Sequence, residues 1–243
     1  MILGDSSGAS LKEIRVSSSN TAFKTIDGVL YSKDGKTLVW YPGKREATSY
    51  TVVSGTETIG EHAFNDASVL TSLTICYGVK TMKKRCLEFC SNITTLSLPS
   101  TLTTLGDYSI WCYRLKNLTL PAGLTTIGKN FLEGCENLET ISVNSSNTSF
   151  MMKDGILYSK DGKTIVACPA KLNKTSYVIP SNVTKICTRA FQYTSFKTNI
   201  TFDSNCLTGW KRYNEYGEDK GAVTATQAAL NEVVCSLDSL VRQ

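Results

Sequence analysis

The chain has 243 residues, of which 41% are hydrophobic and 19% are charged, and its formal net charge is +5. This composition is typical of a folded protein and excludes an intrinsically disordered chain, which has few hydrophobic residues and a high net charge. The chain contains no hydrophobic run of the roughly 18 residues that a membrane-spanning helix needs, so we expect no membrane-spanning segment in this fragment.

The first patterned segment, from Leu11 to Val16, has apolar residues at its first, fourth and sixth places. The same spacing closes each later repeat, and its last four residues alternate as in a short strand with one buried face. The opening half of this repeat is absent. We therefore expect that the chain was cut from a longer protein.

The next segment belongs to a duplicated module, because residues 14–64 align without a gap on residues 141–191. Two β-rich runs in the first copy, Val29–Tyr31 and Thr37–Val39, flank Asp34-Gly35, which predicts a hairpin with a type I′ turn. The second copy has the same pattern around Asp161-Gly162. The sequence thus predicts two inserted β-hairpins.

Five repeat units with a period of about 23 residues share one apolar pattern. They begin at Val52, Ile75, Leu98, Leu120 and Ile179. The fifth and eighth places are apolar, except for Thr56 at the fifth place of the first unit. A glycine follows the eighth place in three units, where we expect a turn that needs a backbone without a Cβ. The third unit is one residue shorter than the others.

A single unit of this size cannot bury its own apolar side, whereas stacked units can. The repeats therefore predict a curved solenoid over residues 11–202, with a ladder of short parallel strands on one side. We assign the chain to the α/β repeat class. The solenoid is interrupted by the two hairpins and counts as one elongated body rather than separate globular domains.

The repeat pattern stops after residue 202, and residues 203–243 are predicted to form a C-terminal cap. Thr224 and Gln227 have the spacing of a capping box, which opens a helix. The apolar residues that follow recur at helical spacing; they are Leu230, Val233, Val234, Leu237, Leu240 and Val241. Solenoids need their open end covered, so we interpret this segment as a capping helix.

The chain has nine cysteines, and three of them, Cys90, Cys112 and Cys135, occupy the same place in successive units. We predict a column of buried, reduced thiols that act as small apolar residues. Zinc is the alternative, starting from Cys86 and Cys90, but no second ligand pair lies at a fixed spacing. We therefore expect no metal site and no cofactor.

Catalytic and nucleic-acid-binding motifs are not evident. Any cysteine–histidine or serine–histidine catalyst would have to use His62, the only histidine, and no neighbouring repeat supplies an obvious orienting carboxylate. The basic run from Lys80 to Arg85 carries no aromatic interleaving, so we interpret it as a solvated edge and expect no nucleic-acid partner. The sequence predicts that the chain is not an enzyme.

The segment from Leu120 to Ile141 reads L-P-x-x-L-T-x-I-G-x-x-x-L-x-x-C-x-x-L-x-x-I, and the inserted module reads D-G-V-L-Y-S-K-D-G-K-T-L-V-x-Y-P. With these two patterns, residues 11–202 resemble the BspA-type leucine-rich-repeat family of bacterial and protist surface proteins. The resemblance implies a secreted or cell-surface, adhesin-like protein that binds a protein ligand such as a host matrix or surface protein.

The outward-facing residues of the predicted strands form the candidate binding site, since alternate residues of a strand point away from the core. They are Ser72, Thr74, Thr95, Ser97, Asn117, Thr119, Thr140 and Ser142. The alternative function is carbohydrate binding or a structural role in the cell envelope, with exposed aromatic residues as platforms. The candidate platforms are Trp40, Tyr77, Tyr108, Trp111 and Tyr113.

Overall fold

The computed structural model describes residues 11–214, 216–223 and 239–242. The chain divides into two compact units. Unit 1 contains the described residues up to 135 together with residues 144–147, and unit 2 contains residues 136–143 and the described residues from 148 onward.

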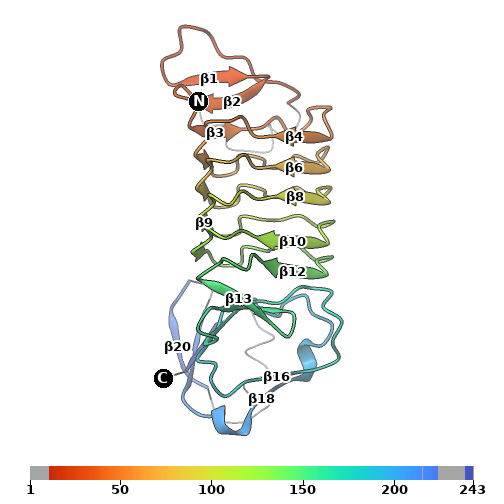
Figure 1. Ribbon diagram of the computed structural model, residues 1–243, viewed down its shortest axis with the longest axis vertical. Helices are drawn as coiled ribbons and strands as arrows, with labels where there is room; N and C mark the ends of the chain where they lie inside the picture. The colour runs from red at the N-terminus through yellow and green to blue at the C-terminus, as the bar shows by residue number, and fades with distance from the viewer. Residues whose placement is uncertain (1–10, 215, 224–238, 243) are drawn as a thin grey trace. The chain divides into compact units, whose positions relative to one another are not determined.

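Unit 1 is built from strands of two to four residues, all but one of which form two sheets within the unit. The strands are β1 (Phe23–Ile26), β2 (Val29–Ser32), β3 (Thr37–Trp40), β4 (Ser49–Thr51), β5 (Thr58–Ile59), β6 (Ser72–Thr74), β7 (Thr81–Met82), β8 (Thr95–Ser97), β9 (Thr104–Leu105), β10 (Asn117–Leu120) and β11 (Thr126–Ile127). One sheet has the order β1-β2-β3-β5-β7-β9-β11, and the other has the order β4-β6-β8. Figure 1 shows the strands of unit 1 stacked as the rungs of a solenoid.

Each repeat of unit 1 contributes a strand to two parallel ladders, whereas the sequence predicted one. The predicted ladder runs through β4, β6 and β8, and Tyr50, Leu73 and Leu96 lie opposite one another in it. The second ladder pairs the seventh and eighth places of successive units, with Ile59 opposite Met82. The apolar eighth places are therefore the buried ends of a second set of strands.

The described residues contain no α-helix, so the assignment to the α/β class was wrong. The turns between the ladders hold non-glycine residues with left-handed backbone at the eleventh place of each unit. These residues and their φ angles are His62 (55°), Arg85 (53°), Tyr108 (53°) and Asn130 (48°) in unit 1, and Arg189 (59°) in unit 2. An α-helix requires φ near −63°, so one such residue in each turn prevents helical hydrogen bonding.

A second left-handed position lies four residues further, at the fifteenth place. Asp66, Phe89 and Gly134 occupy it, with φ of 53°, 57° and 68°. The short third unit lacks this residue. Leu87 forms a parallel bridge with Ile110, and Cys90 occupies the same repeat place as Cys112. Two residues separate Leu87 from Cys90, but only one separates Ile110 from Cys112, so the missing residue lies in this turn.

Side-chain hydroxyls also join successive turns of unit 1. Thr71 donates to the carbonyl of Thr48 at 3.0 Å, and Thr94 donates to the carbonyl of Thr71 at 3.2 Å. Thr56, the polar residue at a core place, is buried, and its hydroxyl donates to the carbonyl of Val53 at 2.7 Å. Its burial is tolerated because its hydrogen bond is made within the turn.

The glycines after the eighth place are needed because successive turns stack closely there, not because the backbone adopts a left-handed conformation. Gly106 and Gly128 are not among the residues with positive φ. A Cβ on Gly106 would lie 2.6 Å from the backbone nitrogen of Lys84, and a Cβ on Gly128 would overlap the backbone of Gly106 and Asp107. Each glycine therefore lets one turn approach the backbone of the turn before it.

The first inserted module is a three-stranded antiparallel meander, β1-β2-β3, joined in parallel to β5. The predicted hairpin is confirmed, but the predicted type I′ turn lies elsewhere. Asp27 and Gly28, between β1 and β2, both have positive φ, as a type I′ turn requires. At the other turn, the amide of Gly35 donates to the carbonyl of Ser32 and Gly35 alone has positive φ, which indicates a type I turn before a left-handed glycine.

Unit 2 repeats this module and adds further strands. Its elements are β12 (Thr140–Val143), β13 (Phe150–Lys153), β14 (Ile156–Ser159), β15 (Thr164–Ala167), β16 (Tyr177–Ile179), β17 (Lys185–Ile186), β18 (Ile200–Phe202), β19 (Trp210–Tyr213), β20 (Asp219–Ala222), β21 (Ser239–Arg242) and the 3₁₀-helices η2 (Lys197–Asn199) and η3 (Ser204–Cys206). The meander β13-β14-β15 matches β1-β2-β3 residue for residue, 127 positions later. The prediction that both copies adopt the same local structure is confirmed.

A hydrogen-bonded pair of tyrosines joins each meander to the repeat that follows it. The hydroxyls of Tyr31 and Tyr50 are 2.7 Å apart, and Tyr158 and Tyr177 make the same hydrogen bond in unit 2. Burial is the main cause that raises the pKa of Tyr31 and Tyr158, so both pairs stay protonated at neutral pH. Each hydrogen bond is thus retained in the neutral form.

The last described segment of unit 2 forms strands. Residues 224–238 of the predicted capping helix lie outside the described residues, and Ser239–Arg242 forms β21 rather than the end of a helix. β21 pairs antiparallel with β17 and with β19. The guanidinium of Arg242 donates to the carbonyls of Ser181, Asn205 and Thr208, which holds this strand in place.

The three cysteines of the shared repeat place are buried in unit 1, as predicted. The exposed fractions of Cys90, Cys112 and Cys135 are 0%, 0% and 2%, and all three are free thiols. The Sγ of Cys90 donates to the carbonyl of Phe64 at 3.1 Å. Burial raises the pKa of Cys135 to about 12 and also raises that of Cys112 well above its ordinary value.

We predict that Gly128→Ala lowers the free energy of unfolding by about 1–3 kcal/mol, the cost of overpacking, because the new methyl group displaces the preceding turn. Denaturant titration of the parent and the variant measures the change. Gly55→Ala is the comparison without steric overlap, since no atom lies within 4 Å of a Cβ there; its φ of 89° means that it reports backbone strain, which Gly128→Ala does not incur. A Gly128→Ala protein as stable as the parent would contradict the close stacking.

We also predict that Cys90, Cys112 and Cys135 do not react with iodoacetamide at pH 8 until the protein is denatured, since their pKa values lie well above that pH and their sulfur atoms are buried. Peptide mapping by mass spectrometry after timed labelling measures each site separately. Cys76, which is only partly buried, serves as the internal comparison. Native labelling of the three at the rate of Cys76 would refute a closed column.

Candidate functional site

The predicted binding residues of unit 1 lie on the strands of the predicted ladder. We call the outward residues of β4, β6, β8 and β10 the strand face. In this row Ser72 and Thr74 are partly buried, whereas Thr95, Ser97, Asn117 and Thr119 are exposed. The other two predicted residues, Thr140 and Ser142, are exposed on β12 in unit 2.

Register aligns the outward residues of the strand face into columns. Ser72 lies opposite Ser49 on one side and Thr95 on the other, and Thr74 lies opposite Ser97. Neighbouring rungs of a sheet are about 4.8 Å apart, so each column presents small hydroxyl side chains at that interval. The row is flat, neutral and able to form hydrogen bonds.

A second line of polar side chains follows the eleventh places of unit 1, and the sequence did not single it out as a site. The Nδ1 of His62 lies 2.8 Å from the Oε2 of Glu88, and the other carboxylate oxygen of Glu88 lies 3.1 Å from Arg85. The Arg85 guanidinium lies 5.3 Å from the ring centre of Tyr108, whose hydroxyl accepts from Asn130 at 3.2 Å. Four successive repeats are thereby connected.

The Glu88 carboxylate is the buried centre of this line. Its side chain is 8% exposed, while those of Arg85 and His62 are 41% and 38% exposed. A buried carboxylate needs charged or hydrogen-bonding partners. Glu88 therefore fixes the orientation of both neighbours. It also corrects the expectation that no carboxylate orients His62.

Aromatic side chains gather beside this line. Phe89 is 46% exposed and its ring lies 4.6 Å from that of Trp111, centre to centre, at an interplanar angle of 51°. Gly134 makes room for this indole, because a Cβ there would overlap Trp111. Tyr113 is 47% exposed. Of the five candidate aromatic platforms, Tyr77 and Tyr113 are exposed, whereas Trp40, Tyr108 and Trp111 are partly buried.

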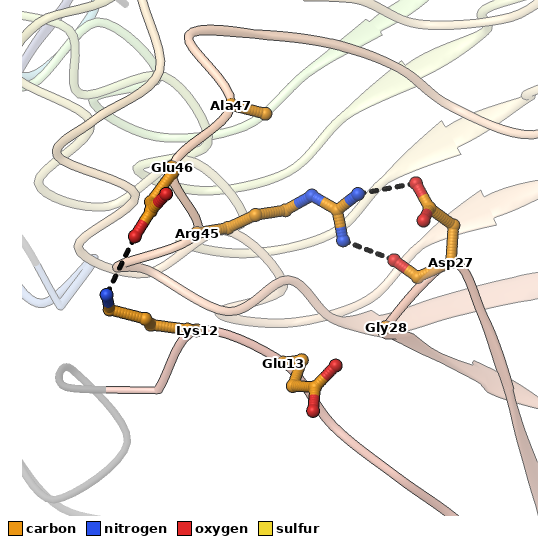
Figure 2. Close-up of a pocket in the computed structure, with 7 residues that line it drawn as sticks. All are labelled: Lys12, Glu13, Asp27, Gly28, Arg45, Glu46 and Ala47. Atoms are coloured by element: carbon orange, nitrogen blue, oxygen red, sulfur yellow. Dashed lines mark hydrogen bonds and ion pairs between the residues drawn. The ribbon is translucent and has the colours of Figure 1, made fainter.

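Unit 1 also has a shallow hollow of about 410 Å³, which Figure 2 shows with its lining residues. Four of the five charged residues that line it pair with one another, and the fifth, Glu13, pairs with Arg15 outside the lining. Arg45 binds the carboxylate and the carbonyl of Asp27, and Lys12 lies 2.7 Å from Glu46. The hydrogen bond to Lys12 lowers the pKa of Glu46. The charges of Arg45, Asp27, Lys12 and Glu46 are therefore paired within the protein.

His62 contacts carboxylates of Glu61 and Glu88, not a thiol. No group of three or more metal-binding side chains is found in the part of the chain that the structure describes. The same residues include no helix long and apolar enough to cross a membrane.

Two solved structures resemble the chain in fold. The pneumococcal vaccine antigen PcpA matches with a TM-score of 0.56 and 20% identity over 79% of this chain and 44% of that one. A leucine-rich repeat protein from Eubacterium ventriosum matches with a TM-score of 0.54 and 23% identity over 75% of this chain and 60% of that one. The chain thus spans about half the length of these two proteins.

No match was found among curated proteins. The model of the BspA type leucine rich repeat region matches residues 41–154 and 167–213 in six copies. These residues include the strands from β4 to β13 and the left-handed turns, whereas β14 and most of β15 lie between the two matched segments. The chain therefore belongs to the BspA-type leucine-rich repeat family.

Proposed function

We propose that this chain is a protein-binding part of a secreted or cell-surface protein with an adhesin-like role, and that its ligand is a host extracellular matrix or surface protein. Membership of the BspA-type family and the fold shared with a vaccine antigen support an extracellular location. The single observation that carries the proposal is the strand face, where small polar side chains are aligned by register over β4, β6 and β8 and are exposed on β8 and β10.

The strand face favours contact with an extended partner. Its rungs repeat at a fixed interval, and its side chains are short, so a flat partner surface can approach the sheet closely. The row lacks the Trp, Tyr and Arg residues that dominate compact, tight interfaces. Binding through it is weak for each rung and gains strength through repetition.

We propose further that the chain has no catalytic role. Burial raises the pKa of Cys86 and Cys90, which keeps these thiols protonated and unreactive. Neither sulfur has an acid–base partner in the contacts described, because both donate to backbone carbonyls.

Carbohydrate binding or a structural role in the envelope is the second candidate, and the observation that favours it is Tyr77, whose exposed fraction is 76%. A sugar stacks best on a flat, accessible aromatic face. Phe89 and Trp111 do not provide one, since their rings are tilted against each other. A glycan array probed with the parent chain and with Tyr77→Ser separates this candidate from protein binding.

We predict that Thr95→Lys combined with Thr119→Lys weakens binding to the protein ligand by about tenfold or more, because two long cations obstruct close approach to the strand face. Biolayer interferometry of the purified chain against fibronectin, collagen, laminin and vitronectin identifies the ligand and measures the loss. Both positions are exposed, so the melting temperature should change by no more than about 2 °C.

Ser100→Lys combined with Ser145→Lys is the matched control, because these exposed residues of unit 1 lie outside the strand face. The control variant should bind as the parent does. If both variants bind equally well, the strand face is not the binding surface. If the chain binds none of the four proteins but binds glycans through Tyr77, the second candidate replaces the first.

A further inference from the structure

We propose that unit 1 carries a second binding surface on its turns, which recognises an acidic polypeptide segment with an aromatic or large apolar residue. We call this surface the turn patch and define it as Arg85, Phe89, Trp111, Tyr113 and Arg114. It is separate from the strand face, and its role does not depend on the ligand of the strand face.

The backbone of Phe89 is the first observation. Its φ is 57°, a region that bulky side chains avoid and that Gly, Asn and Asp tolerate. The equivalent residues of the neighbouring units are Asp66 and Gly134, which suit that conformation. A large aromatic residue at such a position, with 46% of its surface exposed, contributes little to the core. Strained residues that the core does not need are found at functional sites.

The neighbouring turn completes the turn patch. The amide of Trp111 donates to the carbonyl of Leu87, and the amide of Arg114 donates to the carbonyl of Ser91, so these turns lie side by side. The indole of Trp111 packs against the Phe89 ring at 4.6 Å. Tyr113, 47% exposed, lies between Trp111 and Arg114 in the chain.

Two contacts fix the orientation of the Arg85 side chain within the turn patch. Glu88 binds it from the buried side at 3.1 Å, and the Tyr108 ring lies under it. Its side chain remains 41% exposed. Rigid aromatic and arginine side chains that are already positioned lose little entropy on binding, and they are the residues that dominate protein interfaces.

The charge around the turn patch specifies an acidic partner. Arg114, Lys83 and Lys84 are exposed, and none of them has an ion-pair partner among the residues that the structure describes. The Glu88 carboxylate already pairs with Arg85 and contacts the His62 ring. Complementary charge steers a partner to a surface and excludes those of the same sign.

An acidic peptide fits these observations better than an acidic glycan. The exposed ring of Phe89 and the partly buried ring of Trp111 are inclined at 51° to each other, so together they do not present one flat stacking surface. A sulfated glycan would bind through the cationic side chains alone, and its binding would not involve the Phe89 ring.

The experiment selects peptides from a random phage-displayed library on the immobilised full chain, after depletion on the Phe89→Asn/Arg114→Glu variant. Asn tolerates the left-handed backbone of residue 89, so the variant keeps its fold, which its circular dichroism and melting temperature verify. We expect the enriched peptides to share acidic residues around one aromatic or large apolar residue. A fluorescent copy of the best peptide should bind each single variant, Phe89→Asn and Arg114→Glu, at least about tenfold more weakly than the parent.

Two exposed residues of unit 1 outside the turn patch provide the controls, Tyr77→Ser for the aromatic group and Lys33→Glu for the charge. Both should bind the peptide within about twofold of the parent. The proposal is overturned if no peptide is enriched, if the enriched peptides lack acidic residues, or if the controls lose binding as strongly as the variants. It is also overturned if a heparin oligosaccharide binds through Arg114 without dependence on Phe89, which would make the surface a glycan site.

Discussion

The backbone hydrogen bonds between turns 22 or 23 residues apart are the constraint on which the rest of this structure depends. Each rung is only two to four residues long and has no stability of its own. Its donors and acceptors are satisfied by the rungs before and after it, through two parallel ladders and through threonine hydroxyls that reach the preceding turn. Stability therefore rests on neighbours in the stack, as expected for a repeat protein.

The same constraint explains why the turns take left-handed backbone. In each repeat the chain changes direction between the two ladders through residues with left-handed backbone rather than through a helix. Residues such as His62 and Arg85 make the turns instead, and their side chains are carried to the same edge of the solenoid in every repeat. The line of polar contacts centred on Glu88 follows from that geometry.

Much of this fold could be predicted from apolar spacing. The rungs centred on Leu73 and Leu96, the buried cysteine column and the duplicated meander all have strong periodic signals. The second ladder was missed because two-residue strands such as Thr58–Ile59 are too short to show alternation. The α/β assignment was wrong because the residue types of Arg85 and Tyr108 do not indicate the positive φ that their backbones adopt in the turns.

The candidate sites also differ in how far the sequence could predict them. The strand face follows directly from the alternation of a strand, so Thr95 and Ser97 could be named and are exposed. The contacts of His62, Glu88 and Arg85 join two repeats through side chains, and no spacing rule predicts them. Phe89 gave a signal only in retrospect, since it stands where the neighbouring units have Asp66 and Gly134.

The arrangement of the last strands of unit 2 has a consequence for association between molecules. A parallel ladder that ended at β17 would leave a row of unpaired backbone groups, which another chain could extend. Instead, β21 covers β17, and the sheet continues through β19 to β20. All four residues of β20 are exposed, and Lys211 pairs with Asp219 there at 3.2 Å. A charged, hydrated edge of this kind disfavours the addition of a foreign strand, so this side of the sheet is protected against edge-to-edge aggregation.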